Sequence, residues 1–328
     1  MIYILGGSGF IGTRLASLLA RADVDFKIID KTISTTYPKL TVIADVRAVD
    51  SLQAAIQDDA VIINLAAEHR DDVRPLSLYD EVNVGGARNV CTVAREKNIR
   101  TIIFTSTVAV YGFAPVGTDE SGQINPFNDY GRTKFEAEQV YKAWQAEASE
   151  TRSLVIIRPT VVFGEQNRGN VYNLLRQIAS GRFVMVGDGH NKKSMAYVEN
   201  IADCLQYAMG FGPGVHVYNY IDKPDCNMKD LVQTVYRILG RSDKDGLHLP
   251  VVLGLAIGGC FDILACMTGR KFSISAIRVK KFCADTVFET SIARTGFVPP
   301  VLLSEALDRT VRHEFVESHT GDGVFYTE

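Results

Sequence analysis

The chain has 328 residues, with 35 lysines and arginines against 38 aspartates and glutamates, and its formal net charge at pH 7 is −3. This length can bury a full hydrophobic core and predicts one large or two closely packed domains. The even charge balance, without a basic run or aromatic residues interleaved with basic ones, argues against nucleic acid as a partner. The six cysteines lack zinc-site or C-x-x-C spacing, so we expect reduced thiols, a cytoplasmic location and no metal.

Short β-branched segments alternate with amphipathic helical segments through the first half of the chain. The expected strands are residues 2–5, 26–30, 40–45, 60–66, 101–106 and 153–159, and the expected helices are residues 13–22, 52–57, 78–96 and 135–147. This alternation predicts a parallel sheet with helices on both faces, a doubly wound α/β fold of the Rossmann type. The first segment, "IYIL", reads as a strand and not as a signal peptide.

The alternation loosens after Gly164, and beyond Pro224 the chain is mostly helical with loops. We therefore expect the chain to form two parts of unequal size. They are a dinucleotide-binding Rossmann domain over 1–167, to which 194–222 returns, and a smaller, mostly helical substrate-binding portion formed by 168–193 and 223–328. The second part is expected to cross the strand ends, where open parallel sheets bind ligands.

The most apolar later stretch is "VVLGLAIGGCFDILACMTG", which begins at Val251. It is interrupted by Gly258, Gly259 and Asp262, and its uninterrupted apolar length is below the roughly 18 to 20 residues that a membrane span needs. We therefore expect a buried or interfacial helix and no stable membrane insertion. Contact of residues 251–267 with a membrane surface is the alternative.

The segment "GGSGFIG" places Gly6, Gly9 and Gly12 at intervals of three residues, directly after the first expected strand and at the start of a helix. That order is the one a dinucleotide-binding loop requires. Glycine lets the backbone turn tightly and approach a pyrophosphate, while the helix N-terminus offers free N–H groups and positive potential. A glycine-rich turn without a ligand is the simpler alternative.

An acidic residue, Asp30, ends the second expected strand. A carboxylate at this point accepts hydrogen bonds from an adenosine ribose and repels a 2′-phosphate, which favours NAD over NADP. Lys31 beside it weakens this preference. Asp45, which closes "LTVIAD", is placed to meet the adenine amino group, or is an exposed aspartate at a strand end.

The stretch "DYGRTK", residues 129–134, separates Tyr130 and Lys134 by three residues at the start of an expected helix. Positions four apart lie on one helix face about 5–6 Å apart, so the lysine ammonium can reach the phenol. An ammonium beside a phenol favours phenolate and prepares the tyrosine for acid–base chemistry. The spacing alone leaves two interpretations open, a catalytic couple and a surface pair.

Five motifs in order resolve this choice: the glycine loop, "NLAAEH" at 64–69, "NVGGARN" at 83–89, "TSTVAVYG" at 105–112 and "YGRTK" at 130–134. With them the chain resembles the extended short-chain dehydrogenase/reductases, and within that family the nucleotide-sugar epimerases and dehydratases. The resemblance covers nearly the whole chain, since "VGDGHNKKSMAYVENIAD" and "AIRVKKFCAD" also look like substrate segments of the family.

The resemblance implies a catalytic group of three residues. Tyr130 matches the acid–base tyrosine, Lys134 the lysine that holds the nicotinamide ribose and lowers the phenol pKa, and Thr107 the hydroxyl residue that binds the reacting sugar. Ser106 is the nearest competitor of Thr107 for that role. The residues implied to contact NAD are Gly6, Gly9, Phe10, Ile11, Asp30, Lys31, Asp45, Val46, Leu65, Ala66, Ala67, Asn83, Thr105, Tyr130, Lys134 and Pro159.

The resemblance also implies a substrate side of the site, formed by His69, Thr107, Asn170, Lys193 and Arg278. His69 would reach the diphosphate or the sugar, Asn170 the diphosphate, and Lys193 would replace an arginine on the diphosphate. Arg278 fits the second diphosphate cation, with Lys281 as the alternative. One departure from the family pattern is that Val161 stands where many relatives have asparagine, which puts that substrate contact in doubt.

Among the reactions of the family, epimerisation at carbon 4 of a UDP-hexose needs no group beyond these. Dehydratases carry Asp-Glu after the active-site threonine, whereas this chain has Val108 and Ala109. A 4-keto-sugar reductase, which exchanges its cofactor, stays as the alternative, and a non-catalytic NAD-sensing protein is more remote. The family also implies a homodimer, joined by helices over Leu78 to Glu96 and Phe135 to Ala148. In the sequence, apolar positions such as Val140 and Trp144 support it, and ordinary core positions are the alternative interpretation of these residues.

Overall fold

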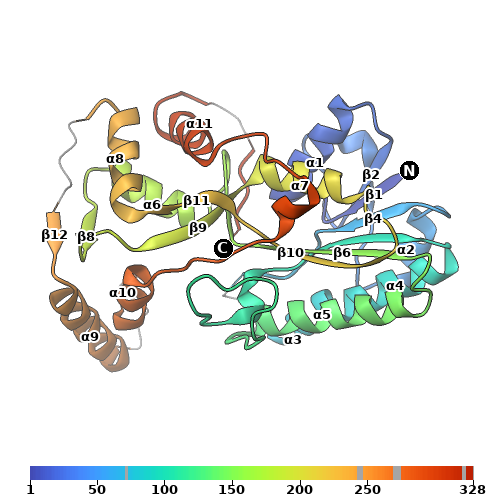
Figure 1. The fold of residues 1–328 in the computed structure, drawn as a ribbon, viewed down its shortest axis with the longest axis horizontal. Coiled ribbons are helices and arrows are strands. Elements are labelled where there is room, and N and C mark those ends of the chain that lie inside the picture. Colours follow the sequence, from blue (N-terminus) through green and yellow to red (C-terminus); the bar gives the residue numbers. More distant parts are fainter. Residues whose placement is uncertain (71–72, 242–246, 269–274, 320–322, 328) are drawn as a thin grey trace.

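The computed structural model describes residues 1–70, 73–241, 247–268, 275–319 and 323–327. Its main sheet has seven parallel strands in the order β10-β6-β5-β4-β1-β2-β3 (Figure 1). The strands are β1 (Ile2–Leu5), β2 (Phe26–Asp30), β3 (Thr41–Ile43), β4 (Val61–Asn64), β5 (Thr101–Thr105), β6 (Ser153–Pro159) and β10 (Gly214–Tyr220). The predicted doubly wound Rossmann sheet is confirmed, and β10 extends it beyond the six strands expected from the sequence.

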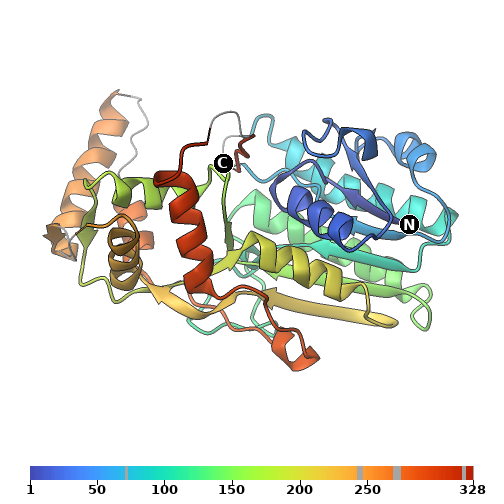
Figure 2. The same ribbon diagram turned by 90° about the horizontal axis from the view of Figure 1, so that it is seen from above.

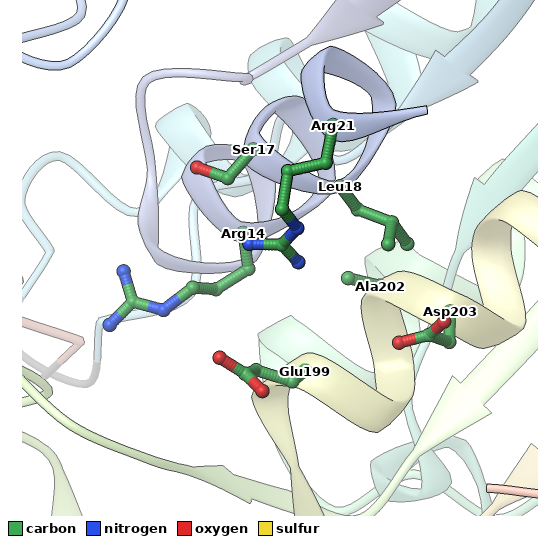
Figure 3. Close-up of a pocket in the computed structure, with 7 residues that line it drawn as sticks. All are labelled: Arg14, Ser17, Leu18, Arg21, Glu199, Ala202 and Asp203. Carbon is green, nitrogen blue, oxygen red and sulfur yellow. The ribbon is translucent and has the colours of Figure 1, made fainter. Parts of the chain in front are cut away.

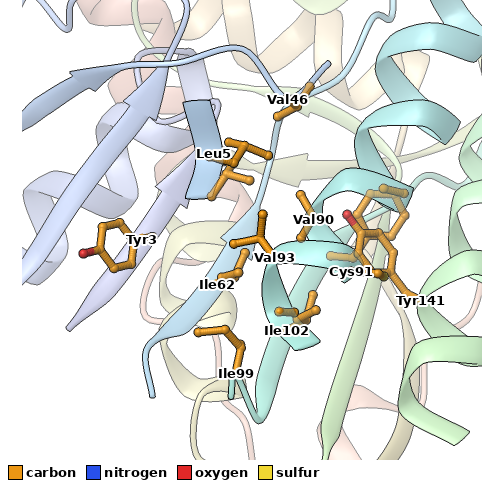
Figure 4. Packing of buried hydrophobic residues seen from close by; sticks show 14 of the residues in the cluster. Tyr3, Leu5, Val46, Ile62, Val90, Cys91, Val93, Ile99, Ile102 and Tyr141 are labelled. Carbon is orange, nitrogen blue, oxygen red and sulfur yellow. The ribbon is translucent and has the colours of Figure 1, made fainter. Parts of the chain in front are cut away.

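Helices cover both faces of this sheet because alternate strand residues point to opposite sides. On one face Tyr3 and Leu5 pack under α2 (Val49–Ala55), α4 (Gly86–Glu96) and α5 (Asp129–Ala146). Figure 4 shows part of this cluster, with Val90, Val93 and Tyr141 facing the strands. On the other face Ile2 and Ile4 pack under α1 (Phe10–Arg21) and α7 (Val198–Ala208).

The single long helix expected over 78–96 is wrong in detail. The segment consists of α3 (Ser77–Tyr79), a π-helical stretch η2 (Asp80–Gly85) and α4. A π turn takes in one more residue than an α turn, and such stretches are frequent at functional sites. Here it contains Asn83, whose side chain contacts two other elements of the candidate site.

The second part of the molecule has its own core. It contains α6 (Asn170–Ala179), α8 (Met228–Ile238), α9 (Val251–Thr268), α10 (Ala276–Cys283) and α11 (Leu303–Phe315), and two small sheets, β11-β9-β7 and β12-β8. Their strands are β7 (Val161–Phe163), β8 (Val184–Val186), β9 (Lys192–Tyr197), β11 (Asp222–Asn227) and β12 (Leu247–Leu249). These short strands were not predicted. The described residues also form 3₁₀ turns at η1 (Pro38–Leu40), η3 (Val108–Tyr111) and η4 (Ile292–Thr295).

The carboxyl edge of the main sheet faces this second part. The chain passes from the end of β6 directly into β7, and from the end of β10 into β11, so both strands lead across the boundary. The two parts lie side by side along the long axis of the molecule (Figure 1). In the part of the chain that the structure describes, no helix is long and apolar enough to cross a membrane.

Candidate active site

The glycine loop lies between β1 and α1, against the segment that follows β4. Gly6 has a φ of +73°, and a Cβ on it would lie 2.6 Å from the backbone nitrogen of Ala66. Its N–H donates to the Ile29 carbonyl at 2.8 Å. Gly9 occupies the N-cap of α1, without a capping side chain. The loop therefore brings bare backbone N–H groups to the carboxyl edge of the sheet, as anion binding requires.

Asp30 lies beside this loop, as expected from the sequence. Its carboxylate accepts from the Ser8 N–H at 3.1 Å and from the N–H and hydroxyl of Thr32, both at 3.0 Å. Lys31 is exposed next to it. Asp45 follows β3 and accepts from Arg47 at 2.6 Å, and this hydrogen bond is the main cause that lowers the pKa of the Asp45 carboxyl. Asp45 is thus a partly exposed, ion-paired residue at a strand end.

The segment after β4, which contains Leu65, Ala66, Ala67 and His69, is held by two buried asparagines. Asn64 donates to the Tyr141 hydroxyl at 2.6 Å and accepts from the Ala66 N–H at 3.0 Å. Asn83 accepts from the Glu68 N–H at 2.9 Å and donates to the Glu68 carbonyl and, at 2.9 Å, to the Thr133 hydroxyl. Asn83 therefore joins this segment to α5, one residue before Lys134.

Thr107 and Ser106 face different partners. The Thr107 side chain lowers the pKa of the Tyr130 phenol, and it accepts from the Ala109 N–H at 3.1 Å as the N-cap of η3. Ser106 donates to Glu138 at 2.6 Å and is 2% exposed. The geometry thus brings Thr107, and not its competitor Ser106, to the tyrosine.

Tyr130 and Lys134 both lie in the first turns of α5, which Asn128 caps by accepting from the Gly131 N–H at 2.9 Å. Burial raises the pKa of the Tyr130 phenol to about 12, against the smaller opposing effect of Thr107. Burial lowers the pKa of the Lys134 ammonium to about 7, and its Nζ lies 4.2 Å from the centre of the Phe104 ring. In the chain by itself, desolvation raises the pKa of the Tyr130 phenol by more than Thr107 lowers it, and the lowering of this pKa by Lys134 stays a prediction.

His69 lies close to the same group. Although the residue is exposed, the protein atoms packed around its ring lower its pKa, the Ala67 backbone and Glu68 oppose this, and Lys134 lowers it further. The charge effect of Lys134 requires proximity between the ammonium and the imidazole. The structure therefore places Tyr130 and Lys134 one helical turn apart on α5, and the charge of Lys134 acts on the His69 imidazole.

The substrate side is assembled less completely. Asn170 is exposed in the first turn of α6. Lys193 donates to the Ala284 carbonyl at 2.6 Å and to the Thr286 hydroxyl at 3.2 Å, which ties β9 to the segment after α10. Arg278 and Lys281 belong to α10, but their side chains lie outside those that the structure describes. Val161 is 40% exposed at the start of β7.

A model of the NAD dependent epimerase/dehydratase family matches residues 2–220. The chain belongs to this family. Over all of its length, and 99% of the relative's, it is 50% identical to the N-acetyl-alpha-D-glucosaminyl-diphospho-ditrans,octacis-undecaprenol 4-epimerase of Escherichia coli O157:H7. It is 26% identical to the UDP-glucose 4-epimerase of Vibrio cholerae, over 95% of this chain and 94% of that protein.

Solved structures of epimerases share the fold. The UDP-glucose 4-epimerase of Thermus thermophilus, solved in complex with NAD, superimposes with a TM-score of 0.71 at 18% identity, over 95% of this chain and 98% of that one. Together with the family match, these relationships make the chain an NAD-dependent 4-epimerase of a sugar carried on a nucleotide or a diphospho-lipid. The enzyme and the cofactor expected from the sequence are confirmed at this level.

The epimerase site fits NAD on two structural observations. First, the loop has no room for side chains at Gly6, where a Cβ would clash with Ala66. Second, the Thr105 hydroxyl at the end of β5 is buried and finds no hydrogen-bond partner among the described residues, so it is available to a ligand. The remaining residues expected to contact NAD lie around this edge: Phe10 and Ile11 begin α1, Val46 is buried after β3, and Pro159 ends β6.

Sequence analysis missed a buried ionic network behind the site. Glu138 accepts from Arg158 at 2.5 and 2.8 Å and from Ser106, and Arg158 also donates to the Tyr111 hydroxyl at 2.7 Å. Tyr111 in turn donates to Asn219 at 2.8 Å. Two signals were present in the sequence: Glu138 follows Lys134 by one helical turn, and Arg158 interrupts the apolar strand "SLVIIRP".

Two further features lie apart from this site. A small polar hollow between α1 and α7 (Figure 3) is lined by Arg14, Ser17, Leu18, Arg21, Glu199, Ala202 and Asp203, none of which was expected to bind a ligand. At the end of α11, His313, Glu317 and His319 form a group of possible metal ligands among the described residues. The two histidine rings stack with centroids 3.8 Å apart at the surface, and neither group contacts the catalytic residues through a hydrogen bond that the structure shows.

Proposed function

We propose that the protein epimerises carbon 4 of an N-acetylhexosamine that is linked through a diphosphate to a polyprenol. The observation that carries this proposal is the 50% identity, over the full length of both chains, with the Escherichia coli O157:H7 enzyme that acts on such a compound. The UDP-hexose expected from the sequence is the second candidate, which is supported by the more distant Vibrio cholerae relative. Both substrates contain a diphosphate, so the same cationic side chains can bind either substrate.

Thr107 and Tyr130 are the proposed acid–base pair. Thr107 lowers the pKa of the Tyr130 phenol, and together the two hydroxyls can orient the sugar's 4-hydroxyl and take or return its proton. NAD bound at this site would supply the hydride acceptor and donor for carbon 4. Returning hydride and proton to the opposite face of the 4-keto sugar completes an epimerisation without net oxidation. With a pKa of about 7, Lys134 can hold or release a proton at neutral pH.

The residues after Thr107 argue against elimination of water. Val108 and Ala109 form the start of η3, and neither side chain carries a proton that it could transfer. A 4,6-dehydratase needs additional acid–base groups at this point, so the 4-keto sugar has only re-reduction available. The reductase alternative differs in releasing its cofactor on each turnover.

The expected homodimer stays a proposal, and of the two interpretations of Val140 and Trp144 the one as core residues holds. Trp144 is fully buried, and Val140 packs against the same core cluster inside the subunit. A dimer through α4 and α5 would therefore use other residues of these helices. Light scattering at micromolar concentration tests it, and a monomeric mass would exclude the dimer.

A substrate comparison tests the proposed function. Purified protein is incubated with polyprenyl-diphospho-N-acetylglucosamine in detergent and, separately, with UDP-glucose and UDP-N-acetylglucosamine, without added NADH or NADPH. We expect conversion of the lipid-linked sugar to its 4-epimer at a rate at least about tenfold above that of either UDP-sugar. Equal or faster conversion of a UDP-sugar would contradict the proposed substrate and support the second candidate.

A further inference from the structure

Helix α9 presents a large apolar surface to solvent. Figures 1 and 2 both place it at the end of the long axis that is farthest from the NAD-binding sheet. Its exposed apolar residues, by exposed fraction, are Val252 (80%), Ile263 (64%), Leu253 (48%), Leu264 (43%), Val251 (38%) and Ile257 (38%). Contiguous apolar surface of this kind marks a site of contact with a partner or a membrane.

The side of α9 that packs against the protein carries small residues instead. A Cβ on Gly254 would lie 2.7 Å from Val186 Cγ1, and one on Gly258 would lie 2.6 Å from the Ala276 nitrogen. Asp262, four residues further along the same face, accepts from the Ala276 N–H at 3.0 Å. Leu255 and Phe261 are half-buried, but most of the large apolar side chains of α9 are exposed, whereas an ordinary surface helix buries such residues. Packing among the residues that the structure describes therefore gives no reason for the exposed valine, leucine and isoleucine side chains.

Basic residues follow this apolar surface in the sequence. From residue 263 to residue 284 the chain contains five lysines and arginines and no aspartate or glutamate. Among them, Lys280 on α10 is exposed, and α10 packs against α9. Apolar side chains that are followed in the sequence by cations match an anionic membrane surface. A symmetric pair of chains joined through α9 would instead bring two basic segments together.

The same segment leads directly to the substrate side of the site. After α10 ends at Cys283, the carbonyl of Ala284 and the hydroxyl of Thr286 accept from Lys193, the residue proposed for the diphosphate. Asp285 between them accepts from the Lys192 N–H at 2.6 Å. The chain runs from α10 at one end of the molecule toward its centre (Figure 1). A substrate diphosphate bound near a docked α10 would therefore lie beside the segment that leads to the catalytic edge of the sheet.

We propose that α9 docks on an anionic membrane surface, with Val252, Leu253, Ile263 and Leu264 at the boundary between headgroups and acyl chains. The helix lies in the interface and does not span the bilayer. The docked enzyme takes the sugar diphosphate of a polyprenyl substrate whose lipid tail stays in the membrane. The choice of this substrate rests on the proposed function, whereas the docking itself rests on α9 and its basic neighbours.

Vesicle sedimentation tests the docking with a matched pair of variants. The full chain is mixed with vesicles of phosphatidylglycerol and phosphatidylethanolamine, or of phosphatidylcholine alone. V252S/I263S removes two exposed α9 side chains, and V298S/L302S removes two of similar exposure, 79% and 69%, outside α9. We expect the wild type and V298S/L302S to sediment with anionic vesicles. The affinity of V252S/I263S for these vesicles should be lower by at least about tenfold. Circular dichroism confirms that each variant is folded.

Other outcomes separate the two proposals. A wild-type protein that stays free of anionic vesicles would overturn the docking, even if it converts the lipid-linked sugar in detergent. Binding that both double variants lose equally would also overturn it. If V252S/I263S instead changes a dimeric mass to a monomeric one, a second chain covers α9 and the membrane does not. Specific vesicle binding by a protein that converts only UDP-sugars would support the docking and contradict the lipid-linked substrate.

Discussion

The Tyr130 phenol and the Lys134 ammonium lie in the first turns of α5, and burial controls the pKa of both groups. The Tyr130 phenol has a pKa of about 12 and the Lys134 ammonium a pKa of about 7, because both charged forms are desolvated. At neutral pH the Tyr130 phenol therefore carries its proton, so it is ready to donate a proton before it can accept one. The charge that stabilises a phenolate during the reaction must come from the substrate complex or from a protonated Lys134.

Tyr130→Phe removes the hydroxyl and keeps the ring that packs at the site. We expect the variant to fold and to bind NAD, while kcat falls by at least about 10²-fold, the usual effect of losing an acid–base group. Steady-state kinetics with a titration of NAD checks both parts. A kcat equal to that of the wild type would remove Tyr130 from the catalytic group.

Thr107→Val and Ser106→Ala form a matched pair that distinguishes the neighbouring hydroxyls. Thr107 lowers the pKa of the Tyr130 phenol, whereas Ser106 donates to Glu138. We expect kcat to fall by about tenfold or more in Thr107→Val, and to stay within about threefold of the wild type in Ser106→Ala. The reverse order of the two kcat values would give the catalytic role to the serine.

Lys134 also predicts a pH dependence of stability in the cofactor-free protein. Its folded pKa of about 7 lies below the ordinary value of 10.5, so between these values the unfolded chain binds more protons than the folded chain. The free energy of unfolding therefore rises with pH above about 7, by up to about 1.4 kcal/mol per pH unit from this group. Lys134→Met should lose this rise. Urea unfolding of both proteins at pH 7 and 8.5 checks it, and equal slopes with pH would show that Lys134 is not desolvated.

At the scale of elements, the Glu138–Arg158 pair joins α5 to β6 directly behind the catalytic residues. The side chains are 0% and 4% exposed, and each forms further hydrogen bonds, to Ser106 and Tyr111. Because Glu138 lies one turn after Lys134 and Ser106 one residue before Thr107, this pair fixes the spacing between the helix and the strand ends. The asparagine of the π-helical stretch, Asn83, holds the opposite side of α5 through Thr133.

Glu138→Gln leaves Arg158 as a buried, unpaired cation. We expect it to lower the free energy of unfolding by about 3–5 kcal/mol. Glu136→Gln, on the same helix, breaks an ion pair with Arg132 in which the side chains are 43% and 38% exposed, and we expect a loss below about 1 kcal/mol. Urea unfolding of both variants makes the comparison. Similar losses for the two would mean that burial does not control the strength of these pairs.

Local sequence predicted some elements better than others. Strands 2–5, 26–30 and 153–159 were predicted to the residue, because a run of buried apolar residues identifies a central parallel strand. The pair Tyr130 and Lys134 was visible because both residues lie on one helix. The π-helical stretch and the strands β8 and β12 were missed, since their geometry depends on contacts between segments far apart in the chain.

At the scale of the whole molecule, the Rossmann sheet and its ligand edge followed from the alternation of segments, but the surface of α9 did not. A run of apolar residues does not reveal which side of a helix faces the protein. That required the positions of Gly254 and Gly258 against β8 and α10. In the same way, the sequence left both Thr107 and Ser106 as candidates for the sugar-binding hydroxyl. The structure distinguishes them, because Ser106 donates to Glu138 and Thr107 acts on the Tyr130 phenol.

The reaction cycle gives a prediction for the molecule as a whole. Since Val108 and Ala109 provide no acid for elimination, the 4-keto sugar can only be re-reduced. In an epimerase the hydride removed from carbon 4 returns within the same active site, so the enzyme needs no reduced cofactor.

We therefore expect substrate deuterated at carbon 4 to give the 4-epimer with the deuterium retained, in a reaction without added NADH or NADPH. Mass spectrometry of the product measures the retained label, and Tyr130→Phe provides the inactive control. Each turnover breaks and reforms one bond from carbon 4 to the same hydrogen isotope, so added unlabelled NADH should not dilute the label. Loss of deuterium to free cofactor, or turnover only when reduced cofactor is supplied, would identify a reductase that exchanges its cofactor.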